Sequence, residues 1–404
     1  MNHANTKYSF HGKRAAVLLF SYYPSDPRPR LAAEALANAG ISVEVVCLRE
    51  RPDEPRREII NGVFVRRVRL TRHRGGKLSY LAQYAAFIVC CFIYLALRSP
   101  TRRYDLVHVH NMPDVLVFSA IIPKLLGAKI ILDLHDPMPE LMQVIFGFSE
   151  NSLTIRLLKT LERWSIKFSD LVLTVNEACR RLYCSRGCPE NKIKVVINAP
   201  EEDLFPYRPV AANGSRPPKP FAALFHGAMV KRNGLDLAVD AFGDVRDVIP
   251  GATLMVCGES NSFLQEIMNT VKDRGLHENV RYLGAKSRSQ MVETINECDV
   301  GIIPNHYNRF SEINTPTRIF ECLALGKPVI APRTKGIEDY FSDEDIIFFE
   351  PGNAHDLAKK IEFVFSNPAK VTTIVERGQQ VYLDHTWARE RSALLDSIAQ
   401  AVAG

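Results

Sequence analysis

The chain of 404 residues is long enough for two domains of ordinary size. Its hydrophobic fraction of 46% and charged fraction of 24% are those of a globular protein, and they exclude an intrinsically disordered one. The formal net charge of +6 is mild, so it favours an anionic substrate or surface and argues against a nucleic-acid-binding protein.

The first residues and the cysteines bear on the cellular compartment. The nine cysteines follow no metal-binding spacing, which is typical of a chain in the reducing cytoplasm. The N-terminus is too polar for a signal peptide, and the apolar run at 15–20 instead predicts a buried parallel strand. We therefore expect a cytoplasmic protein.

A helix at 29–39 and a strand at 42–48 complete a βαβ unit with this first strand. The loop between the first strand and the helix carries Asp26 and Arg28. Because folds of this kind bind ligands at loops that follow the carboxyl ends of strands, we expect both residues to bind a substrate. A proline-rich loop without a binding role is the alternative.

Residues 78–97 form a nearly continuous apolar segment, about long enough to span a bilayer. Cations on both sides of the segment give no clear transmembrane orientation, and tyrosines dilute its hydrophobicity. We expect a helix that packs within its domain or lies at an anionic membrane surface on the cytoplasmic side, rather than a true span. The flanking cations are Arg72, Arg74, Lys77, Arg98, Arg102 and Arg103.

Two further strands are predicted at 104–110 and 129–134, and histidines and aspartates stand at the end of each, beside proline. His135 and Asp136 directly follow the second of these strands. Such a histidine can hydrogen-bond a substrate or stabilise charge, or it can be a satisfied histidine at the end of a strand.

His108 and His110 alternate along their strand, so both side chains face the same side. Together with Asp114 and His135 they suggest a metal site. The spacing matches no known zinc pattern, however, and we predict that no metal is bound.

The segment 206–220 holds five prolines among small polar residues and predicts a linker. The alternation of strands and helices on both sides of it predicts two α/β domains. We expect a first domain at 1–205, a second domain at 221–385, and a C-terminal helix at 386–404.

A loop that begins at Gly227 follows the first strand of the second domain and opens a helix. Lys231 and Arg232 lie within this loop. A loop between a strand and a helix N-terminus is suited to binding a phosphate, although two solvated surface cations are the plainer interpretation.

The segment 315–332 reads as a loop, a short helix and a buried strand. Thr315 is expected to cap a helix that Gly326 ends. Glu321 lies inside this otherwise apolar helix, where a carboxylate is usually solvated on the outer face. A phosphate at the start of the helix and a ribose on Glu321 would together form a nucleotide site.

Glu321 and the run Ala324 to Ile330 resemble the donor-binding signature of retaining glycosyltransferases with two Rossmann-like domains, the GT-B fold of family 4. The first glutamate of that signature would fall at Ile313, with Glu312 one residue earlier. The run from Asp133 to Asp136 likewise resembles the acceptor-side motif of the family. Relatives place two clamp cations in the first loop of the second domain, at positions that hold Ala228 and Asn233 here.

The resemblance implies two facing Rossmann-like domains with a cleft between them, an acceptor-binding first domain, and a second domain that binds a UDP- or GDP-sugar without a metal or other cofactor. The C-terminal helix crosses back to the first domain in relatives. The implied catalytic residues are His135, Asp136, Lys231 and Arg232. Arg318 and Arg309 are the next residues to test if substitution of Lys231 and Arg232 has no effect. The implied donor-binding residues are Gly227, Glu312, Asn314, Thr315, Thr317 and Glu321, and the implied acceptor-binding residues are Asp26, Arg28 and His110.

The function implied is the transfer of a hexose, with retained anomeric configuration, to a glycan or lipid-linked acceptor in cell-surface polysaccharide or glycoconjugate synthesis. Two alternatives remain open at this point. One is a sugar-nucleotide epimerase, because a fold does not fix a function. The other is a non-catalytic protein that binds nucleotide sugars, which the missing first glutamate and the altered clamp positions leave possible.

Overall fold

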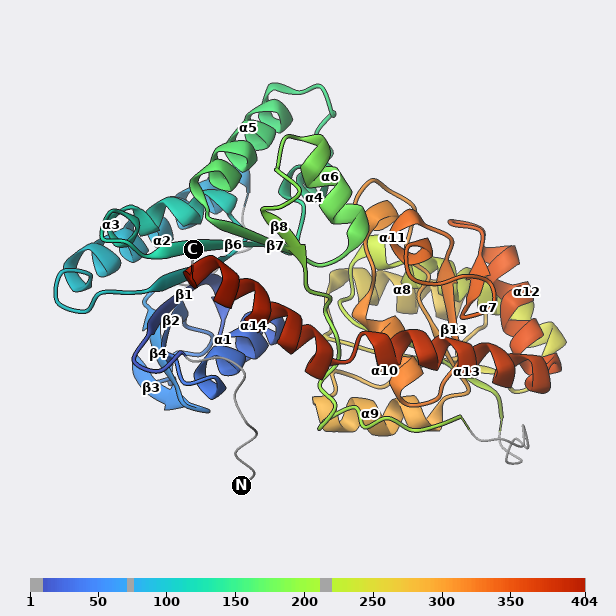
Figure 1. The fold of residues 1–404 in the computed structure, drawn as a ribbon. Helices are drawn as coiled ribbons and strands as arrows, with labels where there is room; N and C mark the ends of the chain where they lie inside the picture. The colour runs from blue at the N-terminus through green and yellow to red at the C-terminus, as the bar shows by residue number, and fades with distance from the viewer. Residues whose placement is uncertain (1–9, 71–75, 211–219, 404) are drawn as a thin grey trace. The chain divides into compact units, whose positions relative to one another are not determined.

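The computed structural model describes residues 10–70, 76–210 and 220–403, which form two compact units (Figure 1). Unit 1 comprises the residues up to Ile197 together with those from Glu390, and unit 2 comprises Asn198–Arg389. Each unit contains one α/β sheet, so the expectation of two α/β domains is confirmed. The division precedes the linker predicted at 206–220, of which residues 211–219 lie outside the described part.

The strands of unit 1 are β1 (Arg14–Tyr22), β2 (Ser42–Leu48), β3 (Arg57–Ile60), β4 (Val63–Val68), β5 (Leu106–His110), β6 (Lys129–Leu134), β7 (Leu171–Thr174) and β8 (Ile193–Val195). They form one sheet in the order β3-β4-β2-β1-β5-β6-β7-β8. Neighbours run parallel, except that β3 is antiparallel to β4. The apolar run predicted as the first strand forms the buried centre of β1.

The helices of unit 1 are α1 (Pro27–Asn38), α2 (Lys77–Arg98), the 3-10 helix η1 (Asp114–Ala120), α3 (Ile121–Leu125), α4 (Met138–Phe146), α5 (Leu153–Phe168), α6 (Glu177–Ser185) and most of α14 (Trp387–Ala403). Helix α1 lies on one face of the sheet, and α2, α3 and α5 lie on the other (Figure 1). The helix η1 packs against both α2 and α5, so these helices form one layer.

The strands of unit 2 are β9 (Ala222–His226), β10 (Thr253–Cys257), β11 (Val280–Tyr282), β12 (Val300–Ile302), β13 (Val329–Pro332) and β14 (Ile347–Phe349). All run parallel in the order β11-β10-β9-β12-β13-β14. The α-helices are α7 (Leu235–Val248), α8 (Ser262–Asp273), α9 (Arg288–Glu297), α10 (Thr317–Ala324), α11 (Lys335–Glu338), α12 (Ala354–Ser366) and α13 (Pro368–Asp384), with 3-10 turns η2 (Lys231–Asn233) and η3 (Ser311–Ile313).

Helix α2 is the apolar segment that the sequence singles out. Within the described ranges it is the one helix long and apolar enough to cross a membrane, judged by length and composition only. Only 17% of its most apolar window is fully buried, and this buried side includes Phe87, Cys91 and Leu95. Its large exposed apolar side chains are Leu81, Val89, Phe92, Ile93 and Leu97. Arg72 and Arg74, two of the predicted flanking cations, lie outside the described residues.

Candidate functional site

The loop from Gly227 to Gly234 leaves the carboxyl end of β9, whose two neighbours are β10 and β12. The strand order reverses at this point, which is where open parallel sheets bind ligands. A Cβ atom on Gly234 would lie 1.8 Å from the carbonyl oxygen of Pro304, and one on Gly258 would lie 2.2 Å from that of Gly227. Only glycine permits these approaches, so the loop is held closely against the ends of β10 and β12.

Glu321 lies on α10 and pairs with His226 at the end of β9. The Nε2 atom of His226 is 2.8 Å from Oε2 of Glu321, and the glutamate remains partly exposed. His226 is buried, and its Nδ1 atom has no hydrogen-bond partner within the described part of the chain. The carboxylate is therefore oriented at the strand end that carries Gly227, rather than solvated on an outer face.

Arg318 reaches the same strand end from the first turn of α10. Its guanidinium donates to the carbonyl oxygen of His226 at 2.7 Å and to Oδ1 of Asn305 at 3.1 Å. One of its nitrogens lies 3.5 Å from where a Cβ on Gly227 would stand. Among the described residues no carboxylate hydrogen-bonds to this guanidinium, and burial lowers its pKa. Arg318 is thus a cation directed at the glycine loop that lacks an acidic hydrogen-bond partner.

Lys231 and Arg232 lie in the turn η2 of the same loop. Lys231 is exposed and Arg232 is partly exposed, with its guanidinium carbon 6.0 Å from the centre of the Phe310 ring. The side chain of Asn233 closes the turn by donating to the carbonyl oxygen of Ala228 at 2.8 Å. Both cations therefore lie on the glycine loop itself, whereas Arg318 reaches the loop from α10.

The expectation that Thr315 caps a helix is wrong. Helix α10 begins at Thr317 after Pro316, and its first turn has no side-chain cap from the described residues. The hydroxyl of Thr315 instead donates to the carbonyl oxygen of Gly336 at 2.6 Å. Glu312 is mostly buried, with Lys335 at 3.7 Å, and Asn314 is partly exposed. Among the described residues no side chain caps α10, and the backbone N–H groups at the start of an uncapped helix favour an anion.

We expect Glu321→Gln to weaken the binding of a nucleoside diphosphate by roughly 1–3 kcal/mol, because it removes a charged hydrogen-bond acceptor. Isothermal titration calorimetry of the full chain measures this change. The control is Glu338→Gln, which alters an exposed carboxylate on α11 of the same unit. Equal affinity of the parent and Glu321→Gln, with both folded, would exclude a contact between Glu321 and the nucleotide.

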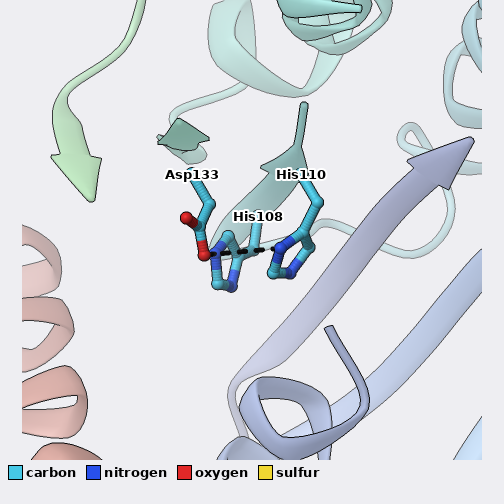
Figure 2. Close-up of side chains that lie close together, drawn as sticks. All are labelled: His108, His110 and Asp133. Carbon is cyan, nitrogen blue, oxygen red and sulfur yellow. Dashed lines mark ion pairs between the residues drawn. The ribbon is translucent and has the colours of Figure 1, made fainter. Parts of the chain in front are cut away.

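The candidate site of unit 1 centres on Asp133, at the end of β6. Arg28 donates to both carboxylate oxygens of Asp133, at 2.8–3.0 Å, and to the carbonyl oxygen of Val196 at 2.8 Å. His108 and His110 reach Oδ2 of Asp133 at 3.6 and 3.4 Å from the neighbouring strand β5 (Figure 2). Asp133 and both histidines are buried.

Burial lowers the pKa of His110, so its ring is neutral. Burial alone would raise the pKa of Asp133, but Arg28 and the nearby histidines outweigh it and hold that pKa well below its usual range. One ligand atom from each of His108, His110 and Asp133 lies within 4.8 Å of the others, close enough to surround a metal ion. Arg28 already occupies both oxygens of Asp133 and would repel a divalent cation, so we interpret the cluster as a buried ion pair beside two histidines.

His135 and Asp136 follow β6 and are partly exposed. Asn111 fixes their loop, because its Oδ1 accepts from the backbone N–H groups of both residues and its amide donates to the carbonyl oxygen of Asp136. The Nδ1 atom of His135 is 3.9 Å from Oδ1 of Asp133. The structure thus places His135 at the rim of the Asp133 cluster.

The residues expected to bind the acceptor have unequal access to solvent. Asp26 is partly exposed and directly precedes α1. Arg28 is engaged by Asp133, and His110 is buried behind it. Asp26 can therefore contact an acceptor directly, whereas Arg28 and His110 contact Asp133 instead.

Sequence reasoning missed the contributions of Asp133, Asn111 and His226. His226 is the last residue of β9, Asn111 directly follows β5, and Asp133 is the penultimate residue of β6. A polar residue at that position was the available signal, but the sequence does not reveal which partner it meets.

Two family models match most of the chain. The glycosyl transferase 4-like domain matches residues 27–199, and the glycosyl transferases group 1 domain matches residues 211–381. Among curated proteins, an uncharacterized glycosyltransferase of Methanocaldococcus jannaschii, MJ1178, is 26% identical over 41% of this chain and 44% of its own length. The chain thus spans about half the length of the curated relatives that it matches.

Solved structures share the fold. Sucrose-phosphate synthase from Thermosynechococcus elongatus superposes with a TM-score of 0.77 at 18% identity, over 97% of this chain and 99% of its own. HepE from Anabaena, in complex with UDP-glucose, gives 0.68 at 16% identity, over 96% and 99%. With the two family models and the pair of α/β domains, the chain belongs to the glycosyltransferases with a glycosyl transferase 4-like N-terminal domain and a group 1 C-terminal domain, on the GT-B fold.

Proposed function

We propose that the protein transfers a hexose from a UDP- or GDP-sugar to a glycan or lipid-linked acceptor, with retained anomeric configuration, in the synthesis of a cell-surface polysaccharide or glycoconjugate. The observation that carries this proposal is the convergence of the Gly227 loop, Arg318 and Glu321 at the end of β9, where the strand order of the unit 2 sheet reverses. The structure of HepE with UDP-glucose supports the donor class.

Unit 2 is proposed to bind the donor. Glu321 would accept hydrogen bonds from the ribose, and the glycine loop with the start of α10, including Asn314 and Thr317, would take the diphosphate. Breaking the glycosidic bond moves negative charge onto the departing diphosphate. Arg318, Lys231 and Arg232 are proposed to stabilise that charge, which is greater in the transition state than in the bound donor. No metal or other cofactor is required in this proposal.

Unit 1 is proposed to act on the acceptor and the transferred sugar. His135 would hydrogen-bond the sugar or stabilise charge near its anomeric carbon, with Asp136 and Asp26 holding hydroxyl groups. Arg28 and His110 would act through Asp133, which keeps the loop of His135 in place. The acceptor hydroxyl would lose its proton to the departing phosphate, so the protein positions and stabilises charge rather than supplying a base.

A thermal-shift screen of the full chain against nucleoside diphosphates and their sugars tests the donor class. A ligand at one hundred times its dissociation constant stabilises the protein by about 2.7 kcal/mol, so a matching base should raise the melting temperature clearly. We expect a shift with UDP or GDP and none with inorganic phosphate at the same concentration. No shift with any nucleoside diphosphate would contradict the proposal.

We also propose that the protein associates peripherally with the cytoplasmic face of an anionic membrane through the exposed apolar side of α2. Arg102 and Arg103 follow the helix and are exposed, which adds attraction to anionic lipid. At low salt the protein should float with vesicles that contain phosphatidylglycerol.

Substitution of Ile93→Glu and Leu97→Glu should abolish this flotation, because it places two charges on the exposed apolar side of α2. Val248→Glu, at an exposed apolar position on α7, is the control and should float as the parent does. A parent protein that stays in the soluble fraction at low salt would contradict membrane association.

A further inference from the structure

Helix α5 carries an exposed apolar stripe in the same layer as α2. Leu153, Leu157 and Trp164 are 81%, 57% and 58% exposed, and their spacing places them along one side of the helix. The opposite side is buried, with Ile155 and Ile166 against the core. An amphipathic helix with this polarity turns apolar side chains to the outside, which is typical of a helix that lies in a membrane surface.

A cavity of about 680 Å³ opens at the C-terminal part of this stripe. Trp164 lines it together with four cations, and among the described residues that line it there is no carboxylate. The four cations are Arg163, Lys167, Arg186 and Lys192. Basic side chains converge here from α5 and from the segment that follows α6.

One of these four cations is neutralised within the protein. Arg186 forms ion pairs with Glu140 and Glu162, both buried. Burial raises the pKa of Glu162 to about 8, and the charge of Arg186 acts against this rise. The charge of Arg186 is therefore balanced by carboxylates of the protein itself, unlike the charges of the other three cations.

The remaining three cations have no carboxylate partner in the described part of the chain. Arg163 donates to the hydroxyl of Thr160 at 3.2 Å, and Lys192 donates to the carbonyl oxygen of Lys167 at 3.3 Å. Asp170, the acidic residue that acts on Lys192, is itself paired with Lys124 at 2.8 Å. Burial lowers the pKa of Lys192, which is the direction expected of a cation without a counter-ion.

We propose that this cavity binds the phosphate group of an anionic membrane lipid, whose acyl part lies against Leu153, Leu157 and Trp164. Lysine and arginine donors suit phosphate oxygens, and a tryptophan beside them suits the boundary between head groups and acyl chains. The inference rests on the proposed membrane association and adds a defined head-group site to it. It does not depend on sugar transfer.

The experiment measures the partition of the full chain onto vesicles of phosphatidylcholine with and without phosphatidylglycerol. Each lysine near an anionic surface adds about one kcal/mol, so Lys167→Ala/Lys192→Ala should weaken binding to the anionic vesicles roughly 30-fold. The matched control, Lys359→Ala/Lys370→Ala, removes two exposed lysines from unit 2 and should bind as the parent does. Circular dichroism melting shows that both variants are folded.

The fluorescence of Trp164 reports on the site itself. In a Trp387→Phe background Trp164 is the sole tryptophan, and its emission should shift to the blue on anionic vesicles. Equal vesicle binding by Lys167→Ala/Lys192→Ala and the parent would overturn the head-group site while leaving membrane association in place. A saturable response to inorganic phosphate alone, with none to vesicles, would overturn the lipid assignment and make the cavity a site for soluble phosphate. A parent that binds neither would overturn both.

Discussion

Replacing Asp133 by alanine is expected to lower the free energy of unfolding of unit 1 by about 3–5 kcal/mol. The substitution leaves the guanidinium of Arg28, which is mostly buried, without the carboxylate that it binds at 2.8–3.0 Å. The loss should show as a lower urea midpoint, followed by the circular dichroism of the full chain.

Two further variants separate this explanation from a general loss of packing. Arg28→Met in the Asp133→Ala background removes the unpaired charge and should recover much of the stability. Asp240→Ala removes an exposed partner of Arg274 and should cost no more than about 1 kcal/mol. An Asp133→Ala variant that unfolds at the same urea concentration as the parent would contradict the importance of the buried pair.

Replacing Arg318 by alanine is expected to reduce the turnover of a nucleotide sugar by about 10²–10³-fold, with a smaller loss of donor affinity. Arg318 is held against the glycine loop by the carbonyl oxygen of His226 and the side chain of Asn305, and it has no acidic hydrogen-bond partner among the described residues. Its charge is therefore available to a departing diphosphate. Steady-state rates of nucleoside diphosphate release, together with calorimetric affinity for the diphosphate, measure the two effects.

Lys231→Ala and Arg232→Ala are expected to lower turnover in the same sense but by less, because Lys231 is exposed and Arg232 is partly exposed. Arg281→Ala, at an exposed position on β11, is the control and should leave turnover unchanged. Weaker donor binding with unaltered turnover in Arg318→Ala would show that the residue only anchors the bound donor. No effect in Arg318→Ala would exclude it from the diphosphate site.

The fold was largely predictable because parallel strands are buried on both faces. Runs such as 15–20 and 222–225 are continuously apolar, and they lie in β1 and β9 within the two sheets. The loops that follow them were predictable as ligand sites for the same topological reason. The family resemblance then assigned the donor to the second sheet.

The pairings within the sites were not predictable, since they join residues far apart in the sequence. His226 and Glu321 are separated by 95 positions, and Arg28 and Asp133 by 105. From local patterns Arg28 was predicted to bind a substrate, and Asp133 was noted only as part of the acceptor-side motif. Sequence spacing does not show that these two buried charges form an ion pair. The prediction that Thr315 caps a helix was wrong for a similar reason. The hydroxyl of Thr315 donates a hydrogen bond to the carbonyl oxygen of Gly336, which is distant in the sequence.

The exposed face of α2 shows the same limit. Its composition does not separate a core helix from an interfacial helix, and only the packed structure reveals that one side of the helix is buried while Leu81, Val89, Phe92, Ile93 and Leu97 are exposed. The cationic cavity beside α5 has no sequence signature, since its lysines come from segments on either side of α6.

The measurement that tests the central proposal most directly is a proton NMR time course of the full chain with UDP- and GDP-sugars, with water as the acceptor. The account predicts that the preferred donor yields a nucleoside diphosphate and a free sugar that appears first with the anomeric configuration of the donor. A sugar that appears first with the opposite configuration would contradict retention. A second nucleotide sugar without free sugar would instead indicate an epimerase, and an unchanged spectrum with every donor, even with an acceptor glycan added, would contradict sugar transfer itself.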